Sequence, residues 1–568
     1  MKLRFDFTNH HYYFTDALQI IQAKKIEDVI PCMREVEKQV KQGHYAAGFL
    51  TYEAASAFCS FLPTYPSSNL PFLWFAICKK PIAFPKNDLT NLDTTSWKTL
   101  KWQYDTSKTE YQQAITKIKN NIAEGNTYQV NYTLRLETEF KEDPYPFYLH
   151  MLQTQQANYS AYLECDEWKF LSASPELFFD WTSDTIIARP MKGTTPRGRT
   201  NIEDKQYENI LRNEKNCAEN LMIVDLLRND LGKIAKQGSV SVDNLFISEK
   251  YPTVWQLTST ISAKVKKDIS LIDIFRAIFP CGSITGAPKI NTMKIIKEIE
   301  KQPRGLYCGA LGIITPNQQA IFSVPIRTLV IQKQKATYGV GSGVTWDSKV
   351  NDEYEEVIQK TQILYESKIP DYLLESLLLK DGSFFLLQEH LERLQNSAIY
   401  FNFLFEKQKI EASLQELANH HQEGQWKVRF LLYASGTFTH ECIAIKPLPP
   451  FLEAQWAPNP ISSQNIFLYH KTSKRDFYPK ANLNHEFLMF NEKDEITEFV
   501  NGNVALFRND QWLTPPIQAG LLNGTMRQYL LKTNKIKEVT IYKKDIAAGC
   551  KLAFMNSVRG WRLIKWQS

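Results

Sequence analysis

The ten residues from Arg189 to Gly198, RPMKGTTPRG, place two prolines and two glycines around a single lysine, Lys192. Proline and glycine interrupt regular structure, so the pattern predicts that Lys192 lies where a strand gives way to a tight turn. A lysine amine is nucleophilic only when neutral, and its ordinary pKa of about 10.4 leaves little neutral amine at pH 7. Burial, nearby arginines or a bound cation would lower that pKa. The alternative is a surface lysine in a Gly/Pro turn.

The length of the chain, 568 residues, is too great for a single hydrophobic core and predicts several domains. The sequence KIPD at 368–371 marks the best boundary, without a Gly/Ser-rich linker. We therefore expect one domain at 1–368 and a second at 369–568.

Charge and cysteine content restrict the class of protein. The net charge of +6 is a small excess without long runs, which gives no support for nucleic-acid binding. There is no 18-residue apolar run and no secretion signal, so we expect no membrane association. Nine scattered cysteines without a CxxC pair predict reduced thiols and no zinc site. Together these features favour a cytoplasmic protein.

Hydrophobic periodicity predicts a mixture of strands and helices in the first domain. Helices are expected at 26–42, at 107–125 with a capping box formed by Ser107 and Glu110, and at 352–365. Strands are expected at 46–52, 72–78, 128–136, 159–164, 177–180, 309–315, 320–324, 327–332 and 336–341. The strand at 128–136 alternates as if half-buried, and residues 205–300 are expected to be mainly helical.

Acidic residues near these elements are candidates for catalysis and metal binding. Glu176 precedes an apolar strand, where desolvation would raise its pKa toward that of a general acid. Glu353, Glu356 and Lys360 are spaced i, i+3, i+7 and share one helix face. Two carboxylates one turn apart repel unless a cation lies between them. With Glu219, at the start of another amphipathic helix, they would suit Mg²⁺.

Two glycine-containing stretches and one arginine are candidates for binding an anion. Residues 280–289, PCGSITGAPK, form a glycine turn that enters a helix, whose free N–H groups can hold an anion. Gly341 and Gly343 belong to a similar open stretch, and Arg327 offers a bidentate fork for a carboxylate. Taken singly, these and the acidic residues could equally be solvated surface groups, because spacing alone does not bring them together.

Six segments in residues 105–365 resemble the chorismate-utilising enzymes: SPELF, PMKGT, AENLMIVDLLRNDLG, GSITGAPK, IRTL and EYEE, in this order. The resemblance implies an α+β domain of two large antiparallel sheets packed together, with helices outside. It also implies a subfamily, because aminodeoxychorismate synthase component I has lysine at the position of Lys192, where anthranilate synthase usually has alanine.

The same resemblance implies roles for the candidate residues. Lys192 would add to carbon 2 of chorismate and expel the carbon-4 hydroxyl, Glu176 would protonate that leaving group, and ammonia would attack carbon 4 and release the lysine. Mg²⁺ would be held against the ring carboxylate by Glu219, Glu353 and Glu356. The substrate would be bound by Arg327, Thr285, Lys360 and the backbone near Gly341 and Gly343.

The sequence departs from the family pattern in two places, and the family's residue roles are not carried over there. Gln256 stands where the family usually has histidine, and glutamine cannot act as an acid near neutral pH, so no proton transfer is expected there. The N-terminal portion matches poorly, which leaves a regulatory tryptophan pocket unsupported. Since no glutamine amidotransferase domain is visible, the resemblance implies that a separate glutaminase subunit supplies ammonia in trans.

Residues 371–568 carry a second ordered set of segments: LYHKTSKRDFY at 468–478, ITEFVNGNVALF at 496–507 and GLLNGTMR at 520–527. These resemble the class IV aminotransferases and aminodeoxychorismate lyase, which use pyridoxal phosphate, and imply a two-part α+β unit. Lys471 would carry the cofactor and move a proton, with Lys474 as a rival. Glu498 would pair with the pyridinium nitrogen. The phosphate would be bound by Arg393, Gly524, Thr525 and, on a weaker match, Ser557.

The two resemblances together predict a fused synthase and lyase that makes 4-aminobenzoate for folate synthesis. One alternative is an anthranilate or isochorismate-type synthase fused to an amino acid aminotransferase. Another is a non-catalytic scaffold, against which the presence of both Lys192 and Lys471 argues. No nucleic-acid or membrane partner is expected, and a homodimer is considered.

Overall fold

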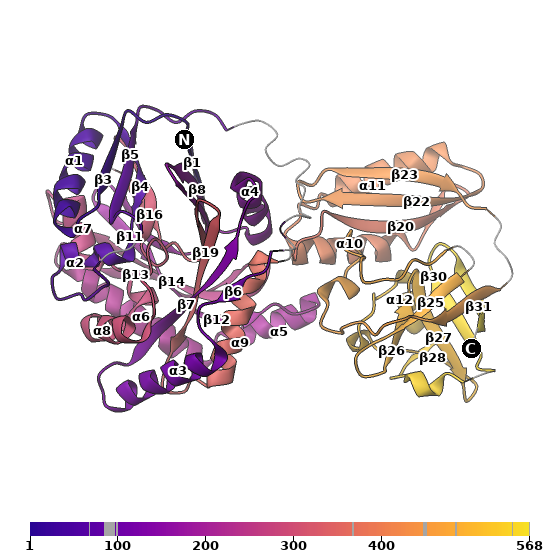
Figure 1. The fold of residues 1–568 in the computed structure, drawn as a ribbon. Helices are drawn as coiled ribbons and strands as arrows, with labels where there is room; N and C mark the ends of the chain where they lie inside the picture. The colour runs from indigo at the N-terminus through magenta and orange to yellow at the C-terminus, as the bar shows by residue number, and fades with distance from the viewer. Residues whose placement is uncertain are drawn as a thin grey trace. The chain divides into compact units, whose positions relative to one another are not determined.

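The computed structural model describes residues 1–66, 69–84, 97, 100–317, 319–365, 368–446, 451–482, 485–547 and 549–566 (Figure 1). Its contacts divide the chain into two compact units. The first contains Met1–Pro196 and Tyr207–Lys368, and the second contains Arg197–Gln206 and Ile369–Ser568. The later division falls between Lys368 and Ile369, within the KIPD sequence. The grouping of Arg197–Gln206 with the second unit was not expected from the sequence.

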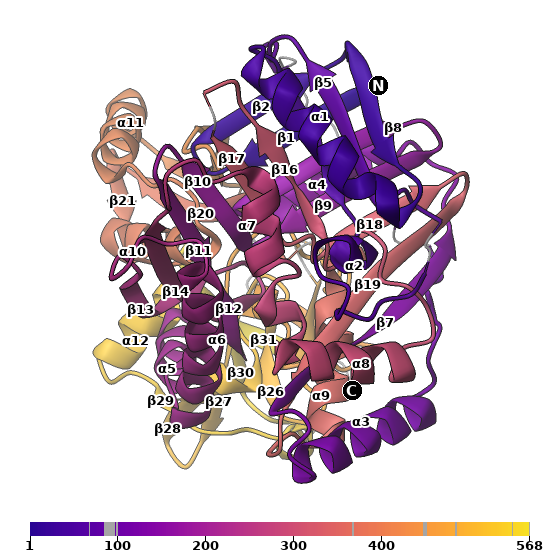
Figure 2. The same cartoon turned by 90° about the vertical axis from the view of Figure 1, so that its left-hand side faces the viewer.

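Two antiparallel sheets form the centre of the first unit (Figure 2). The first has the order β15-β7-β19-β18-β9-β8-β1-β2, with β6 beside β7. Its strands are β1 (Lys2–Phe7), β2 (His10–Phe14), β6 (Gln103–Tyr104), β7 (Gln129–Glu139), β8 (Tyr159–Cys165), β9 (Trp168–Ser174), β15 (Gly286–Ala287), β18 (Thr328–Gln332) and β19 (Lys335–Val344).

The second sheet has the order β12-β14-β11-β10-β17-β16-β4-β5-β3, with β13 beside β14. Its strands are β3 (Gln19–Ala23), β4 (Tyr45–Leu50), β5 (Leu73–Cys78), β10 (Leu177–Thr182), β11 (Thr185–Arg189), β12 (Met191–Pro196), β13 (Ser241–Lys250), β14 (Val254–Lys264), β16 (Ala310–Ile314) and β17 (Ala320–Ser323).

Three hydrophobic cores hold this unit together. One lies between the sheets, where the rings of Phe49 on β4 and Phe170 on β9 are 4.9 Å apart. Full burial of each such ring contributes roughly 1.5–3 kcal/mol. The other two cores lie between one sheet and its covering helices. The covering helices are α1 (Val29–Lys41), α2 (Ala55–Phe58), α3 (Lys108–Ala123), α4 (Pro144–Gln155), α6 (Glu214–Gly232), α7 (Leu271–Ile278), α8 (Lys289–Ile299) and α9 (Val350–Thr361). Helix α5 (Asn201–Leu211) begins among the residues assigned to the second unit and ends among those of the first.

Most elements predicted for this unit are confirmed. Ser107 forms the predicted capping box, in which its backbone N–H donates to Glu110 at 2.8 Å and its hydroxyl accepts from the backbone N–H of Glu110 at 3.3 Å. The half-buried character of 128–136 was wrong, because β7 is buried on both faces from Gln129 to Leu136. Strands β1, β2 and β3 were missed.

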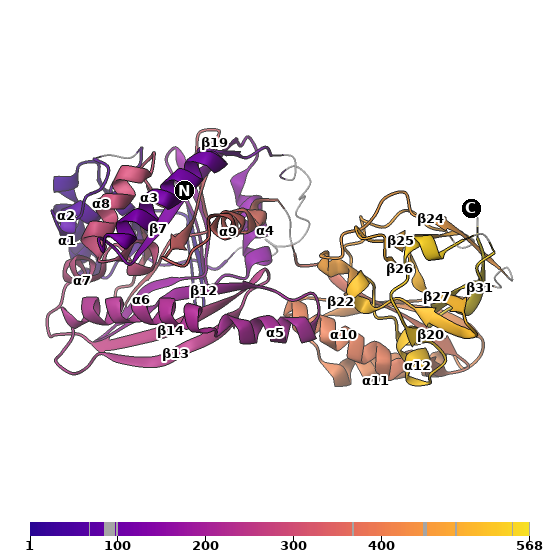
Figure 3. The same cartoon turned by 90° about the horizontal axis from the view of Figure 1, so that it is seen from below.

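Helices dominate residues 205–300, as expected, but the long hairpin β13–β14 also lies within them and was not predicted. Figure 3 shows α6 lying along this hairpin, and it packs on β12 and β14. Lys192 lies within β12 and not in a turn. The predicted irregularity is nevertheless present, because the pairing of β12 with β14 shifts register between Met191 and Thr194. Gly193 lies at this shift with a φ of 91°.

The second unit has the predicted two parts. Helices α10 (Leu387–Phe401) and α11 (Lys407–His420) pack on a sheet of order β21-β20-β22-β23. The other part is a sheet of order β26-β25-β24-β31-β30-β27-β28-β29, in which β26 also pairs with β27 and so closes six strands into a ring. The elements are β20 (Tyr372–Lys380), β21 (Ser383–Phe385), β22 (Gln425–Tyr433), β23 (Phe438–Ala444), β24 (Leu452–Trp456), β25 (His485–Phe490), β26 (Ile496–Phe499), β27 (Gly502–Arg508), β28 (Gln511–Thr514), α12 (Thr525–Lys532), β29 (Lys537–Glu538), β30 (Leu552–Asn556) and β31 (Gly560–Trp566).

Two further sequence expectations concern the chain as a whole. The nine cysteines are free thiols, as expected. In the part of the chain that the structure describes, no helix combines the length and apolar character that crossing a membrane requires.

Candidate active sites

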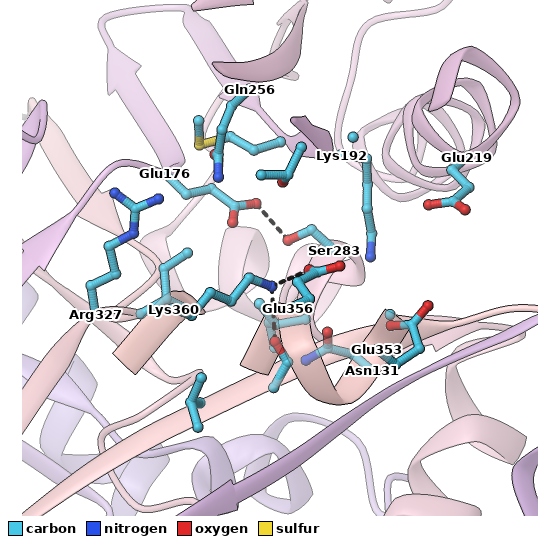
Figure 4. Close-up of a pocket in the computed structure, with 18 of the residues that line it drawn as sticks. Asn131, Glu176, Lys192, Glu219, Gln256, Ser283, Arg327, Glu353, Glu356 and Lys360 are labelled. Carbon is cyan, nitrogen blue, oxygen red and sulfur yellow. Dashed lines mark hydrogen bonds and ion pairs between the residues drawn. The ribbon is translucent and has the colours of Figure 1, made fainter. Parts of the chain in front are cut away.

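A cavity of about 240 Å³ in the first unit is lined by nearly all residues predicted to act there (Figure 4). These are Glu176, Lys192, Glu219, Arg327, Gly341, Gly343, Glu353, Glu356 and Lys360. They come from both sheets and from two helices, so the fold brings together residues that are far apart in the sequence. Thr285 does not line the cavity. Its hydroxyl donates to the carbonyl of Cys281 at 3.1 Å, within its own turn, so its predicted contact with substrate has no support here.

Glu176 lies in the loop between β9 and β10 and is only 2% exposed. The hydroxyl of Ser283 donates a hydrogen bond to its Oε1 at 2.5 Å. Burial raises the pKa of Glu176 to about 7, although the hydrogen bond from Ser283 and the charge of Lys192 act in the opposite direction. A carboxyl group with this pKa can donate a proton near neutral pH, as a general acid must.

The amine of Lys192 lies over the backbone of Gly343. A β-carbon on residue 343 would overlap Nζ of Lys192, so glycine leaves the space that the amine occupies. Burial lowers the pKa of Lys192, and the nearby charge of Lys360 lowers it further, whereas Glu219, Glu356 and Glu176 oppose the shift. The direction is the one that a nucleophilic amine requires, because a lower pKa leaves more neutral amine.

Gly341 and Gly343 lie within strand β19 and not in an open stretch, paired with Thr133 and Asn131 of β7. The N–H of Thr133 donates to Glu300 at 3.0 Å, and that of Asn131 donates to a loop carbonyl at 2.8 Å. Both pairs are therefore of the type without mutual hydrogen bonds. It follows that the N–H groups of Gly341 and Gly343 point away from β7.

A side-chain contact agrees with this orientation. The amine of Lys360 donates to the carbonyl oxygen of Gly341 at 2.9 Å, which places that carbonyl outside the ladder with β7. In a strand, the N–H and C=O of one residue point to the same side, and residues two apart share that side. Since both glycines line the cavity, their N–H groups lie on its side of the strand, and anion binding by them stays a prediction.

The three carboxylates predicted to bind Mg²⁺ each have a partner. Glu356 pairs with Lys360 at 2.5 Å, Glu353 accepts from Ser348 at 2.7 Å, and Glu219 lies 3.9 Å from Lys215. Within the described ranges, no three His, Cys, Asp or Glu side chains are grouped closely enough to hold a metal ion. The set therefore does not form a closed protein cage.

The charges of these carboxylates nevertheless suit a divalent cation. Burial raises the pKa of Glu219, and the neighbouring Glu353 and Glu356 raise it further, because negative charges repel. Burial also acts to raise the pKa of Glu356, but Lys360 and Lys192 outweigh it, and the net shift is downward. Mg²⁺ needs only a few carboxylates, since waters and substrate oxygens complete its octahedron. The residues fit the ion, and the metal site stays a prediction.

Arg327 lies at the other end of the cavity from Glu219 in Figure 4. Its Nη1 is buried, and it has no hydrogen-bond partner in the described part of the chain. An unsatisfied buried donor costs about 1–3 kcal/mol, which a bound carboxylate would recover. Arg327 therefore gives the cavity a cationic end opposite Glu219, and this polarity suits a substrate with carboxylates.

Three cavity neighbours were not assigned a role from the sequence. Ser283, which holds Glu176, lies inside the PCGSITGAPK segment, where the glycines were the only signal. Gln129 is fully buried on β7, and both polar atoms of its side chain lack partners among the described residues. Its Nε2 lies 3.0 Å from the position that a β-carbon of Gly343 would take, beside the Lys192 amine. Gln256 lines the cavity from β14, as its place in the motif implied.

Lys471 of the LYHKTSKRDFY segment is half-buried in the second unit. Its carbonyl accepts from the N–H of Leu374 on β20 at 2.9 Å. Burial lowers the pKa of Lys471 to about 7, and Arg393 contributes, whereas Glu375 opposes the shift. The rival Lys474 is also partly exposed, and its amine lies 3.9 Å from Asp371.

The residues predicted to bind phosphate converge around His390 and Glu375. Arg393 donates to both oxygens of Glu375, at 2.8 and 2.6 Å. His390 Nδ1 lies 2.7 Å from Glu375, and its Nε2 lies 2.9 Å from the hydroxyl of Ser557 and 3.2 Å from that of Thr525. The sequence assigned no role to His390 or Glu375, because their pairing depends on packing α10 against β20.

Glu498 is buried close to this group. The hydroxyl of Tyr478 donates to it at 2.6 Å, and the N–H of Leu522 donates at 3.2 Å. Burial raises the pKa of Glu498 to about 7, and these hydrogen bonds limit the rise. A β-carbon on Gly524 would overlap the side chain of Asn503, which explains glycine before α12. A half-buried lysine, a buried acid and a helix N-terminus beside an arginine fit pyridoxal phosphate.

Comparison with known proteins assigns both halves of the chain. Residues 8–366 match the family described as chorismate binding enzyme, and residues 372–565 match the one described as amino-transferase class IV. Aminodeoxychorismate synthase component 1 of Bacillus subtilis is 39% identical over 251 residues, which are 44% of this chain and 53% of that protein. Anthranilate synthase component 1 of Aquifex aeolicus is 35% identical over 267 residues, which are 47% of this chain and 54% of that protein.

The chain thus spans about half the length of these curated relatives. Among solved structures, anthranilate synthase component I from Streptococcus pneumoniae matches with a TM-score of 0.53 and 22% identity, over 64% of this chain and 90% of that one. This match shows that the first unit shares the fold of that protein.

Proposed function

The chain belongs to the chorismate binding enzyme family, and from this premise we propose that it converts chorismate to 4-aminobenzoate in two steps. Residues 1–368 would make 4-amino-4-deoxychorismate, and residues 369–568 would remove pyruvate from it. The observation that carries the proposal is that Lys192 lines one cavity together with Glu176 and has a lowered pKa. The resemblance implies lysine at this position in aminodeoxychorismate synthase component I, whereas anthranilate synthase usually has alanine.

The first step uses two groups of the chain in turn. Nζ of Lys192 forms a bond to carbon 2 of chorismate while the bond between carbon 4 and its hydroxyl breaks. Glu176 gives its proton to that oxygen, which leaves as water. Ammonia then forms a bond to carbon 4, and the bond between Lys192 and carbon 2 breaks. The pKa of about 7 at Glu176 leaves a protonated fraction for this purpose near neutral pH.

Substrate orientation follows from the two ends of the cavity. Arg327, Lys360 and the N–H groups of Gly341 and Gly343 would bind the carboxylates of chorismate. Mg²⁺ would be held by Glu219, Glu353 and Glu356, and its positive charge would stabilise electron density pushed onto the ring carboxylate. Several relatives are named component 1, which supports a separate glutaminase subunit as the source of ammonia.

The second step would use Lys471 of the other unit. Pyridoxal phosphate, when bound, supplies an electron sink for the amine of the intermediate. Arg393, Thr525, Ser557 and the N-terminus of α12 would bind its phosphate, and Glu498 would face its ring nitrogen. Lys471, with a pKa of about 7, would take the proton from ring carbon 4 as pyruvate leaves.

A second candidate is anthranilate synthesis in the first unit, because an anthranilate synthase component is 35% identical to this chain. The presence of Lys192 argues against it. An isochorismate-type synthase fused to an amino acid aminotransferase is a related alternative.

A cytoplasmic location and a homodimer are further proposals. Cell fractionation would test the location, and sedimentation would test the oligomeric state.

One assay separates these possibilities. The full chain is given chorismate, ammonia and Mg²⁺, with pyridoxal phosphate present or omitted, and the products are separated by chromatography. We expect 4-aminobenzoate with the cofactor and accumulated aminodeoxychorismate without it. Lys192→Ala should lose the first step and still convert supplied aminodeoxychorismate. A fluorescent anthranilate product would refute the proposal, and turnover of glutamine by the chain alone would refute the separate glutaminase.

A further inference from the structure

Residues Arg197–Gln206 follow strand β12 directly in the chain, yet they are part of the second unit. The rest of that unit begins only at Ile369. The segment therefore contributes to a unit whose catalytic lysine, in the proposed function, is Lys471. Its contacts indicate which part of the second unit depends on it.

Arg197 and Asp204 fix the segment in place. The guanidinium of Arg197 donates to both oxygens of Asp204, at 2.7 and 2.8 Å, and the two side chains are almost fully buried. The same guanidinium donates to the carbonyl of Tyr400 at 3.1 Å, and the hydroxyl of Tyr400 donates to the carbonyl of Gly198 at 2.7 Å. Because this buried ion pair is bidentate and has further hydrogen bonds, it holds the segment in one geometry.

Arg199 reaches from the segment to the residues just before Lys471. Its Nη1 donates to the hydroxyl of Tyr469 at 3.0 Å and to the carbonyl of Ser463 at 3.2 Å. Glu203 holds the other side of the guanidinium, with a distance of 2.9 Å from its Nε. The backbone carbonyl of Arg199 lies 3.2 Å from Nε2 of His470, the residue adjacent to Lys471.

The contacts of His470 are consistent with one neutral tautomer. Burial lowers the pKa of His470 to about 4, so the ring carries a single N–H at neutral pH. The carbonyl of Arg199 can only accept, so Nε2 carries the hydrogen, and Nδ1 accepts from the hydroxyl of Ser397 at 3.0 Å. The ring also packs 4.4 Å from that of Tyr400.

We propose that Arg199 is a positioning residue for the cofactor lysine, and that it acts through His470. Lys471 would then be held on one side by Leu374 of β20 and on the other by a segment that precedes the second domain in sequence by more than a hundred residues. This inference rests on the proposed function, in which Lys471 carries pyridoxal phosphate. A second domain that starts at Ile369 would lack one of the two hydrogen-bond partners of His470.

The test uses four variants of the full chain. His470→Phe keeps an aromatic ring but cannot donate, and His470→Gln restores a donor. Arg199→Met removes the anchor, and Arg199→Lys keeps its charge. His440→Phe and Arg508→Met are controls, because His440 and Arg508 are exposed residues of the same unit with a single weak polar contact each. Thermal unfolding checks that every variant is folded.

The first measurement is amide hydrogen exchange in the absence of cofactor. His470→Phe should lose protection at 197–206 and 466–472 together, whereas the controls should not. Loss at 466–472 alone would overturn the proposed contact. This measurement does not depend on the catalytic proposal.

The second measurement is pyridoxal phosphate binding, followed by the visible absorbance of the bound cofactor and its titration with pH. We expect His470→Phe and Arg199→Met to weaken binding about tenfold, the value of one net hydrogen bond, and to shift the titration. His470→Gln and Arg199→Lys should recover most of the affinity. Unchanged affinity and spectrum in His470→Phe would refute the positioning role. If the unmodified chain bound no pyridoxal phosphate, the proposed function would fail. The hydrogen-exchange measurement alone would then test the contact between His470 and the 197–206 segment.

Discussion

Ser283 donates a hydrogen bond of 2.5 Å to Oε1 of Glu176 in the wall of the first cavity. A hydrogen bond to a carboxylate favours its ionised form, whereas burial favours the protonated form. Burial is the larger effect here, and the pKa of Glu176 is raised to about 7. This balance gives the first step a pH dependence that can be measured.

We expect the rate of the first step to fall as pH rises through about 7, because Glu176 must be protonated to act as an acid. Ser283→Ala removes a group that stabilises the carboxylate, so the pKa should rise further and the fall should move to higher pH. The measurement is the pH profile of aminodeoxychorismate formation under saturating ammonia. A shift to lower pH in Ser283→Ala would contradict this account.

Replacing Glu176 by Gln should lower kcat of the first step by about 10²–10⁴-fold, the usual contribution of a positioned proton donor. The remaining activity should lose the fall near pH 7. Conversion of supplied aminodeoxychorismate by the same protein is the internal control, and it should be unchanged.

Gly343→Ala is expected to disable the first step, because the added β-carbon would overlap Nζ of Lys192. Displacement of a reacting group by about 1 Å costs on the order of 100-fold in rate. Gly232→Ala is the matched control, since nothing lies within 4 Å of its new β-carbon at the end of α6. The control should keep full activity and raise the free energy of unfolding by about 0.4–1 kcal/mol. Steady-state kinetics measure the rate of the first step in both variants, and denaturant unfolding measures their stability.

Lys471→Ala should remove cofactor retention and lower the rate of the second step by more than about 100-fold, because the Lys471 amine is the proposed proton carrier. Lys474→Ala should have little effect, since that amine is partly exposed and near Asp371. Dialysis followed by cofactor absorbance measures retention, and pyruvate release measures turnover. The reverse ranking of the two variants would show that the rival lysine is the functional one.

Removal of divalent metal with a chelator should stop the first step and leave the second unchanged. Glu353→Gln should weaken Mg²⁺ binding, measured by titration calorimetry with Mg²⁺. Glu355→Gln on the same helix is the control, because that residue is exposed and points away from the cavity. Equal affinity in the two variants would argue against the carboxylate set as the metal site.

Local chemistry explains why much of this structure was predictable. The capping box at Ser107 and Glu110 depends on residues three apart, and it forms as predicted. The spacing of Glu353, Glu356 and Lys360 is a property of any helix, and all three line the cavity from α9. The segment around Lys192 contained enough glycine and proline to signal an irregularity, but not to show that it is a register shift within a strand.

Residues that act through contacts distant in sequence could not be found in this way. Glu375 and His390 are fifteen residues apart on different elements, and only the packing of α10 on β20 pairs them at 2.7 Å. From the sequence, Gln129 could be recognised only as part of a strand. Its side-chain amide is unsatisfied because it is buried among groups that the sequence does not place nearby.

The sequence by itself determined the reactive groups of this protein: two lysines, each within a motif that carries acidic residues or glycines at fixed spacing. Tertiary structure decided their state. Nζ of Lys192 lies over Gly343, Glu176 is enclosed with Ser283, and Lys471 lies next to a histidine that contacts a segment from much earlier in the chain. The reason is physical: a motif specifies which groups are present, whereas burial and neighbouring charges, which exist only in the folded chain, set their pKa values and orientation.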